Sequence, residues 1–293
     1  MTTTNDTVSD IELAGGVSIP QVGFGVFQIP GKDTQRAVEE ALEIGYRHFD
    51  TAAAYYNEEG VGAALKATGM AGKVFVTTKL RNCDQGYDAT KVAFEESRRK
   101  LGVDVLDLYL IHWPFALIDR YVETWRAILE IKEQGVLRAA GVSNFLPEHL
   151  QRLIDETGEA PAINQIEVHP RFSQPDVRAY CASHGIAVEA YSPLGHGGDM
   201  NAPEVLRAAE AHGVTPAQVV LHWHVQSGRV VIPKSSHPDR MRQNLDIFGF
   251  SLTDEEMASI DALHTPQGRI SGDPATNVNS QSWADQFSRG NVS

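Results

Sequence analysis

The sequence is poor in cysteine. Cys83 and Cys181 are the only two cysteines among 293 residues, and they lie far apart in the chain. They cannot form a disulfide framework or a cysteine-based zinc site, so we expect neither to hold the fold together. So few cysteines fit a reducing compartment, and we expect a cytoplasmic protein.

Long apolar runs and an excess of positive charge are also missing. No run approaches the roughly 20 apolar residues that cross a bilayer. The first ten residues, MTTTNDTVSD, lack the basic start and apolar core of a signal peptide. Lys and Arg number 25 against 38 Asp and Glu, which gives a formal net charge of −13 at pH 7. Phosphate backbones and anionic lipids repel so acidic a chain, which argues against nucleic-acid and membrane partners.

A complete glycine fingerprint for dinucleotides (G-x-G-x-x-G) is absent as well. The nearest strings, GFGVFQ at 23–28 and GVGAAL at 60–65, both lack the third glycine, and the second lies inside a helical pattern. A doubly wound open sheet is expected to carry this fingerprint after its first strand. The sequence therefore argues against that fold.

What the sequence does contain is a regular alternation of short apolar segments with longer amphipathic ones. Eight candidate strands lie at 22–24, 47–49, 74–78, 105–111, 137–142, 163–166, 187–191 and 230–232. Helical patterns follow them, for example at 33–44, 88–101, 121–133 and 215–225. Eight such units without a dividing linker predict one (β/α)₈ barrel domain over 1–293. We expect a β-hairpin cap at 10–20 and an extra C-terminal helix and loop.

Seven consecutive candidate strands end in polar or functional side chains. They are Asp50, Lys79, His112, Ser143 with Asn144, Gln165, Tyr191 with Ser192, and Lys234 with Ser235. The carboxyl ends of barrel strands form one rim, where active sites of this architecture lie. We therefore expect these residues to share one pocket.

The first three strand ends suggest acid catalysis at a carbonyl group. A buried Lys79 near Asp50 stays cationic, and a cation beside a phenol lowers the pKa of that phenol, which can then donate a proton near neutral pH. His112 is suited to hydrogen-bond the substrate oxygen. Taken singly, each residue is more often a structural ion pair or cap. Tyr55 and Tyr56 both remain candidates for the phenol.

A second cluster follows the last strand, in the segment VIPKSSHPDRMRQN at 231–244. Its three cations, Lys234, Arg240 and Arg242, lie within a stretch of nine residues, although the chain as a whole is acidic. Free backbone N–H groups at a helix that begins near Pro238 would join these cations in an anion site. The alternative is a solvated basic helix end.

Several strings, in this order, resemble the aldo-keto reductase family, and within it the small bacterial members of the 2,5-diketo-D-gluconate reductase type. They are GYRHFDTAAAYYNEEGVG, VFVTTKL, LDLYLIHWP, GVSNF, NQIEVHP and VVIPKSSHPDRMRQNLDIF. The resemblance covers nearly the whole chain. The family's Asp-x₄-Tyr spacing selects Tyr55 over Tyr56.

The resemblance implies NADP(H)-dependent reduction of a small aldehyde or ketone by a monomeric enzyme. Tyr55 would donate the proton, Asp50 and Lys79 would tune it, and His112 would position the carbonyl. Phe27 and Trp113 would line the substrate pocket, which the C-terminal loop at 264–293 would shape. The cofactor would contact Ser143, Asn144, Gln165, Tyr191, Ser192, Leu194, Lys234, Ser235, Ser236, Arg240, Gln243 and Asn244.

Three features depart from the family pattern. Arg81 stands where related enzymes often have tryptophan, His237 where gluconate reductases have an arginine near the 2′-phosphate, and the tail after Arg269 is individual. If Arg81 faces the pocket, it would suit an anionic or polyhydroxylated carbonyl compound. It could equally point to solvent.

Two other functions compete with reduction. One is a metal-dependent barrel hydrolase that uses Asp50 and His112, for which Glu167 and His169 are the only spare ligands. The other is a catalytically idle relative that acts as a binding subunit. The presence of all four catalytic positions argues against the second alternative.

Overall fold

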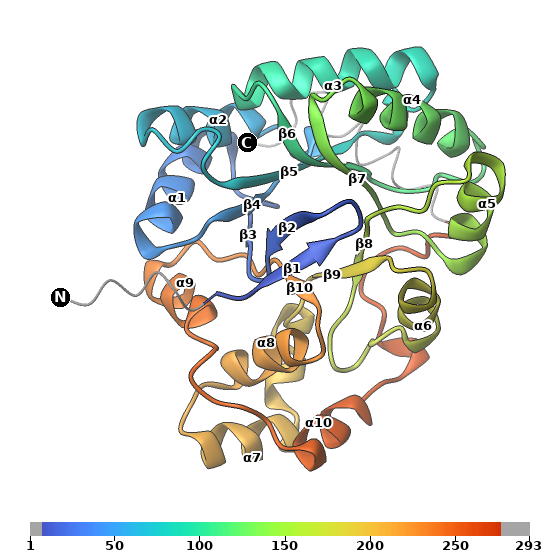
Figure 1. The fold of residues 1–293 in the computed structure, drawn as a ribbon. Helices are drawn as coiled ribbons and strands as arrows, with labels where there is room; N and C mark the ends of the chain where they lie inside the picture. The colour runs from blue at the N-terminus through green and yellow to red at the C-terminus, as the bar shows by residue number, and fades with distance from the viewer. Residues whose placement is uncertain (1–7, 277–293) are drawn as a thin grey trace.

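The computed structural model describes residues 8–276 and contains a curled sheet of eight parallel strands with helices outside it (Figure 1). The strands pair in chain order and are β3 (Phe24–Gly25), β4 (His48–Asp50), β5 (Phe75–Leu80), β6 (Leu106–Ile111), β7 (Leu137–Ser143), β8 (Ile163–Glu167), β9 (Ala187–Tyr191) and β10 (Val230–Val231). A parallel bridge between Val22 and Val231 joins the two ends of the sheet. There the amide of Gly23 donates to Val231 O at 2.8 Å. The predicted (β/α)₈ barrel is thus confirmed.

All eight expected strands are present, and their ends differ from the expected ones by at most two residues. The helices are α1 (Gly31–Ile44), α2 (Glu58–Ala67), α3 (Tyr87–Leu101), α4 (Tyr121–Glu133), α5 (Pro147–Thr157), α6 (Pro175–Ser183), α7 (Pro203–His212), α8 (Pro216–Gln226), α9 (Pro238–Leu245) and α10 (Asp254–Asp261). Short 3₁₀ turns lie at Ala53–Tyr55, Asn82–Asp84, Gly195–Gly197, Asp199–Asn201 and Pro266–Gly268. Within residues 8–276, no helix combines the length and apolar content that a bilayer span requires.

An antiparallel hairpin, β1 (Asp10–Leu13) and β2 (Val17–Pro20), covers the amino-terminal end of the barrel (Figure 1). Its turn uses Gly15 and Gly16 at φ values of 90° and 75°, which a residue with a side chain adopts only with strain. Buried hairpin residues such as Ile19 pack against the barrel strands. This confirms the predicted cap and leaves the opposite end, where the strands finish, for the site.

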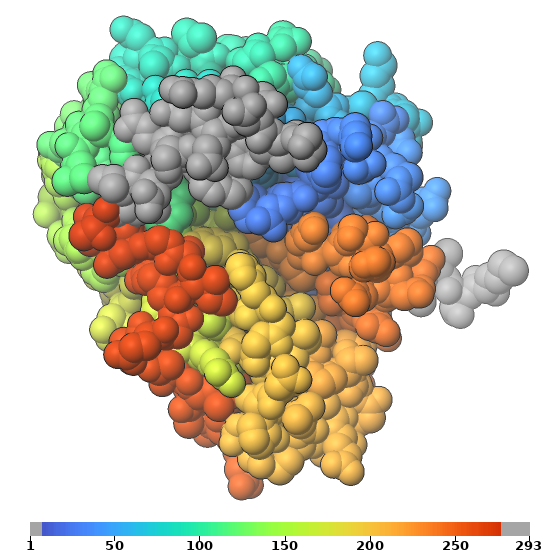
Figure 2. Space-filling model, turned by 180° about the vertical axis from the view of Figure 1, so that it is seen from behind, coloured from blue at the N-terminus to red at the C-terminus, as the bar shows by residue number. Residues whose placement is uncertain are grey.

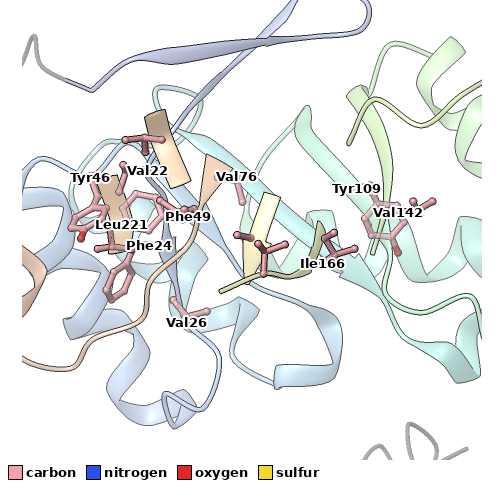
Figure 3. Packing of buried hydrophobic residues seen from close by; sticks show 14 of the residues in the cluster. Val22, Phe24, Val26, Tyr46, Phe49, Val76, Tyr109, Val142, Ile166 and Leu221 are labelled. Atoms are coloured by element: carbon pink, nitrogen blue, oxygen red, sulfur yellow. The ribbon is translucent and has the colours of Figure 1, made fainter. Parts of the chain in front are cut away.

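Side-chain packing supports the first barrel strand, β3, which has only two residues. Phe24 lies edge-on to Tyr46 and Phe49, with ring centres 5.5 and 6.2 Å apart (Figure 3). The Tyr46 hydroxyl donates to the carbonyl of Met241 at 2.9 Å, which connects this layer to α9. Packing therefore fixes the position of Asp50 relative to the segment at 231–244, which contains the predicted anion site.

The C-terminal part of the chain forms α10 and a loop that runs to the last described residue. Thr253 caps α10 with Glu256 in a capping box. The predicted pocket loop at 264–293 is described as far as Thr276, and its remainder lies outside the described residues.

Gly141 of β7 provides a test of barrel packing. A Cβ there would lie 2.7 Å from the side chains of both Ile163 and Leu110. We expect Gly141→Ala to lower the free energy of unfolding by about 1–3 kcal/mol, as overpacked cores do, in urea denaturation. Gly249→Ala is the matched control, because a Cβ there meets nothing within 4 Å. Equal stability of the two variants would contradict the packing described.

Candidate active site

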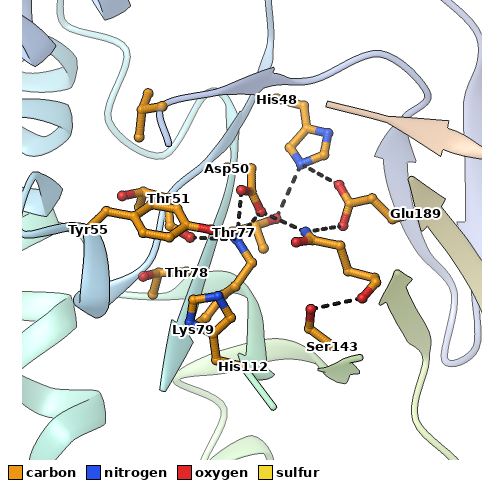
Figure 4. Close-up of polar contacts among 12 residues, drawn as sticks. His48, Asp50, Thr51, Tyr55, Thr77, Thr78, Lys79, His112, Ser143 and Glu189 are labelled. Carbon is orange, nitrogen blue, oxygen red and sulfur yellow. Dashed lines mark hydrogen bonds and ion pairs between the residues drawn. The ribbon is translucent and has the colours of Figure 1, made fainter. Parts of the chain in front are cut away.

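The four predicted catalytic residues meet at the carboxyl end of the barrel (Figure 4). Asp50 ends β4, Lys79 lies near the end of β5, and His112 directly follows β6. Tyr55 closes the 3₁₀ turn after β4. The barrel therefore brings together four side chains that are between 5 and 62 positions apart in the sequence, as we predicted.

Lys79 and Asp50 form a buried ion pair. The Lys79 Nζ lies 2.7 Å from each Asp50 carboxylate oxygen, and it also donates to the carbonyl of Thr51 at 2.9 Å. Burial alone would lower the pKa of Lys79, but the attraction of Asp50 and hydrogen bonding outweigh it and raise that pKa above its ordinary value. Lys79 is therefore a fixed cation at neutral pH.

Tyr55 lies beside this cation, with its hydroxyl 3.5 Å from the Lys79 Nζ. Burial raises the pKa of Tyr55, whereas the Lys79 charge lowers it, and the net pKa is above the ordinary value. The expectation of a lowered phenol pKa is therefore wrong for the net shift, because burial outweighs the cation. Tyr55 keeps its proton at neutral pH, which is the form that a proton donor needs.

His112 and Phe27 both lie close to the ring of Tyr55. Their ring centres are 5.6 and 4.9 Å from that of Tyr55. Burial, with a smaller contribution from the Lys79 charge, lowers the pKa of His112 to about 3, so its ring is neutral and can donate one N–H. Phe27 is 38% exposed, and Trp113 is half-buried next to His112. Both expected substrate residues thus lie at this end of the barrel.

Behind Asp50 lies a buried network that we did not predict from the sequence (Figure 4). The Gln165 Nε2 donates to Asp50 and to Glu189, both at 2.8 Å. Glu189 Oε1 has no hydrogen-bond partner and faces His48 Nε2 at 3.6 Å. His48 Nδ1 lies 3.2 Å from the carbonyl of Pro20, which can only accept, so Nδ1 carries the proton and Nε2 a lone pair.

This geometry favours a proton on Glu189. An ionised Glu189 would set its oxygen against the His48 lone pair and a second negative charge near Asp50. Burial raises the pKa of Glu189 to about 8, with the Asp50 charge adding to the increase, and burial lowers the pKa of His48 to about 3. The signal in the sequence was an acidic residue inside the buried strand segment at 187–191.

Asn144 and Tyr191 connect His112 to the C-terminal segment. Asn144, at a left-handed φ of 64°, donates to the His112 carbonyl at 2.9 Å. The Tyr191 hydroxyl lies 2.7 Å from Asn144 Oδ1 and 2.9 Å from Ser271 Oγ. The Ser143 hydroxyl donates to the backbone of Gln165 at 2.8 Å. Hydrogen bonds thus connect residues expected at the nicotinamide, Asn144 and Tyr191, to His112 of the candidate catalytic group.

A carboxylate holds the C-terminal segment on the rim. Glu167 accepts from the amides of Ile270 and Ser271 at 2.6 and 2.7 Å. His169 lies between Glu167, at 3.2 Å, and Asp199, at 2.6 Å. Burial lowers the pKa of His169, but these two carboxylates outweigh it and raise the pKa to about 9, so the ring is a cation.

These contacts occupy the spare ligands of the hydrolase alternative. Both His169 ring nitrogens face carboxylates, and Glu167 binds backbone amides. In the described part of the chain, no group of three or more His, Cys, Asp or Glu side chains could hold a metal ion. No observation favours a metal-dependent hydrolase.

The predicted anion cluster surrounds the start of α9. Lys234 and Arg240 are exposed, and neither forms an ion pair with a residue of 8–276. No side chain caps α9, so its first N–H groups are available to a ligand. Arg242 differs, because it pairs with Asp239 at 3.0 Å.

The other expected cofactor residues lie on two neighbouring segments. The Ser235 hydroxyl accepts from the His237 amide at 3.0 Å, whereas Ser236 and Gln243 are exposed and Asn244 is buried. Ser192 and Leu194 begin the segment after β9, which Figure 2 shows between the C-terminal residues and the α9 region.

Arg81 is not a free cation. Its Nε and Nη2 lie 2.6 and 3.1 Å from the two Asp84 carboxylate oxygens. This bidentate pair neutralises the added charge, so the structure does not support a special affinity of Arg81 for anionic substrates.

The Aldo/keto reductase family model matches residues 21–265. An aldo-keto reductase of Mycolicibacterium smegmatis is 52% identical over 91% of this chain and 97% of its own length. The methylglyoxal reductase DkgA of Yersinia pestis is 49% identical over 90% and 95%. Among solved structures, a mutant of Gox0644 in complex with NADPH superimposes with a TM-score of 0.90, at 46% identity over 93% of this chain and 99% of its own.

The proton on Glu189 has a measurable consequence for stability. The folded-state pKa of about 8 lies above the ordinary value of 4.5, so the folded protein binds the extra proton between these values and loses stability as pH rises through them. Relative to Glu189→Gln, the wild type should lose up to about 1.4 kcal/mol per pH unit in urea unfolding between pH 5 and 8.

Glu43→Gln, which changes an exposed carboxylate, is the control. It should show no such slope relative to the wild type. His169 contributes in all three proteins and cancels in the differences. A pH-independent difference between wild type and Glu189→Gln would show that Glu189 is ionised when folded.

Proposed function

The chain belongs to the aldo/keto reductase family, and we propose that it reduces a small aldehyde or ketone with NADPH, with Tyr55 as the proton donor. The observation that carries this proposal is the buried Lys79–Asp50 pair, whose Nζ lies 3.5 Å from the Tyr55 hydroxyl. All four catalytic positions are occupied, which disfavours an idle relative.

Tyr55 and His112 would act together on the carbonyl oxygen. The neutral His112 donates one N–H to that oxygen and orients it toward the Tyr55 hydroxyl. As negative charge develops on the oxygen, Tyr55 transfers its proton to it. The Lys79 cation, held by Asp50, stabilises the phenolate that remains. The cation whose effect on the resting pKa of Tyr55 is outweighed by burial thus acts when the proton leaves.

The cofactor is NADP(H), which supplies a hydride when bound. The chain fits its phosphate, because Lys234 and Arg240 have no carboxylate partner among residues 8–276 and the α9 start is uncapped. We assign Ser143, Asn144 and Gln165 to the nicotinamide carboxamide and Tyr191 to its ring. The 2′-phosphate and adenine end would contact Lys234, Ser235, Ser236, Arg240, Gln243 and Asn244, with Ser192 and Leu194 between the two ends.

The substrate class that we propose is a small uncharged carbonyl compound. Arg81 is already paired with Asp84, which removes the reason to favour an anionic substrate. Phe27 provides an apolar wall beside Tyr55, and Trp113, which follows His112 in the chain, would provide a second. A similar protein is named a methylglyoxal reductase, so methylglyoxal belongs first in an NADPH-oxidation screen with glyoxals, diketones, aryl aldehydes and keto-sugars.

Tyr55→Phe tests the proton donor. The variant keeps the ring that contacts Phe27 and His112 but lacks the O–H, so we expect kcat to fall by about 100- to 10,000-fold while NADPH still binds. Steady-state kinetics and NADPH fluorescence titration measure the two effects. Tyr56→Phe is the control and should remain active. Retained turnover in Tyr55→Phe would contradict the assignment.

Arg240→Ala tests the phosphate contact. Loss of a charge-assisted hydrogen bond should weaken NADPH binding by about 10- to 100-fold and leave NADH binding nearly unchanged. Arg242→Ala, whose arginine is paired with Asp239, should alter neither. An equal loss for NADPH and NADH in Arg240→Ala would place the 2′-phosphate elsewhere.

A further inference from the structure

A cavity lies away from the catalytic rim, near the amino-terminal end of β9. It has a volume of about 400 Å³ and is bounded by α6, the start of β9 and the turn between α8 and β10 (Figure 1). Its walls include two arginines and several small or apolar side chains, namely Arg178, Arg229, Ala179, Ala182, Ile186 and Val188. None of the lining residues is acidic.

Arg229 is buried in this wall and forms no ion pair with a residue of 8–276, although the charge of Asp261 acts on it from a longer distance and partly offsets the fall in its pKa. Arg229 is only 3% exposed. Its side chain donates to His224 Nδ1 at 3.1 Å and to the carbonyl of Trp223 at 3.3 Å. His224 is itself neutral, because burial and the Arg229 charge hold its pKa far below the ordinary value. The guanidinium also lies 4.2 Å from the Trp223 ring. These neutral groups orient Arg229 but do not neutralise it.

Arg178 supplies a second unpaired cation from α6. Within residues 8–276 its side chain forms no ion pair, and its Nε is buried without a hydrogen-bond partner. The two arginines act on each other: burial and then the Arg178 charge lower the pKa of Arg229 to about 9. A chain with 38 acidic residues has placed none of them in this cavity.

Two like charges beside one partly buried cavity are unfavourable unless an anion joins them. Carboxylate and phosphate oxygens accept paired, charge-assisted hydrogen bonds from guanidinium groups. We propose that this cavity binds a small oxyanion, a phosphate or a carboxylate, between Arg178 and Arg229. The apolar wall formed by Ala182, Ile186 and Val188 leaves room for a short carbon chain on the ligand.

Arg178→Gln provides the test, because it removes one cation without breaking any hydrogen bond of Arg229. The protein is first saturated with NADP⁺, so that the 2′-phosphate contacts are filled, and is then compared in sodium phosphate and sodium chloride of equal ionic strength. Wild-type Tm should rise by about 2–4 °C in phosphate. Arg178→Gln should lose this rise and, in chloride, be at least as stable as the wild type, since the repulsion is gone.

Arg207→Gln is the matched control, because it removes an exposed positive charge from α7, outside the cavity. It should respond to phosphate as the wild type does. Isothermal titration of the NADP⁺-saturated proteins with phosphate and, separately, with butyrate distinguishes a compact anion from a carboxylate with a carbon chain. The same response in all three proteins, or no binding of either anion to the wild type, would overturn the proposal.

Discussion

The candidate site depends on one buried ion pair, that between Lys79 and Asp50. Removing two charges from water is costly, and a buried pair persists only where further hydrogen bonds satisfy both partners. Here the carbonyl of Thr51 accepts from Lys79, and Gln165 donates to Asp50. Strand ends supply most of these groups, so the rigidity of the barrel fixes the cation beside Tyr55.

The surrounding titratable groups limit the charge that this pair must tolerate. His112 and His48 are neutral because burial lowers the pKa of each to about 3, and Glu189 keeps its proton up to about pH 8. Among these groups, one cation, Lys79, and one carboxylate, Asp50, therefore carry the charge. In the proposed reaction, Tyr55 loses a proton and becomes a negative phenolate beside the Lys79 cation. The attraction between these two charges favours the proton transfer.

Two other clusters of charged residues differ in whether their charges are paired. His169 is a cation flanked by Glu167 and Asp199, and through them it joins the C-terminal segment to the segment after β9. Arg178 and Arg229 form no ion pair within the described chain, and no acidic residue lines their cavity. The first cluster is complete and structural, whereas the second is complete only with an anion from solution.

The sequence by itself predicted the barrel and the residues that meet at the candidate site. Alternating apolar periods placed all eight strands to within two residues, and the strand ends, with the motif spacing of the family that the chain resembles, predicted Asp50, Tyr55, Lys79 and His112 as the candidate catalytic residues. These features are local, because each depends on which face of one strand a residue occupies and on where that strand ends. Local pattern also predicted the uncapped helix start at Pro238.

Only the tertiary structure decided which side chains meet and how their pKa values shift. The contact between Gln165 and Asp50 joins residues 115 positions apart, and Arg178 and Arg229 share a cavity only because α6 packs beside the turn after α8. Burial raised the pKa of Tyr55 against the effect of Lys79, which motif spacing could not reveal. Desolvation depends on every group packed around a residue, and a linear pattern specifies only its neighbours along the chain.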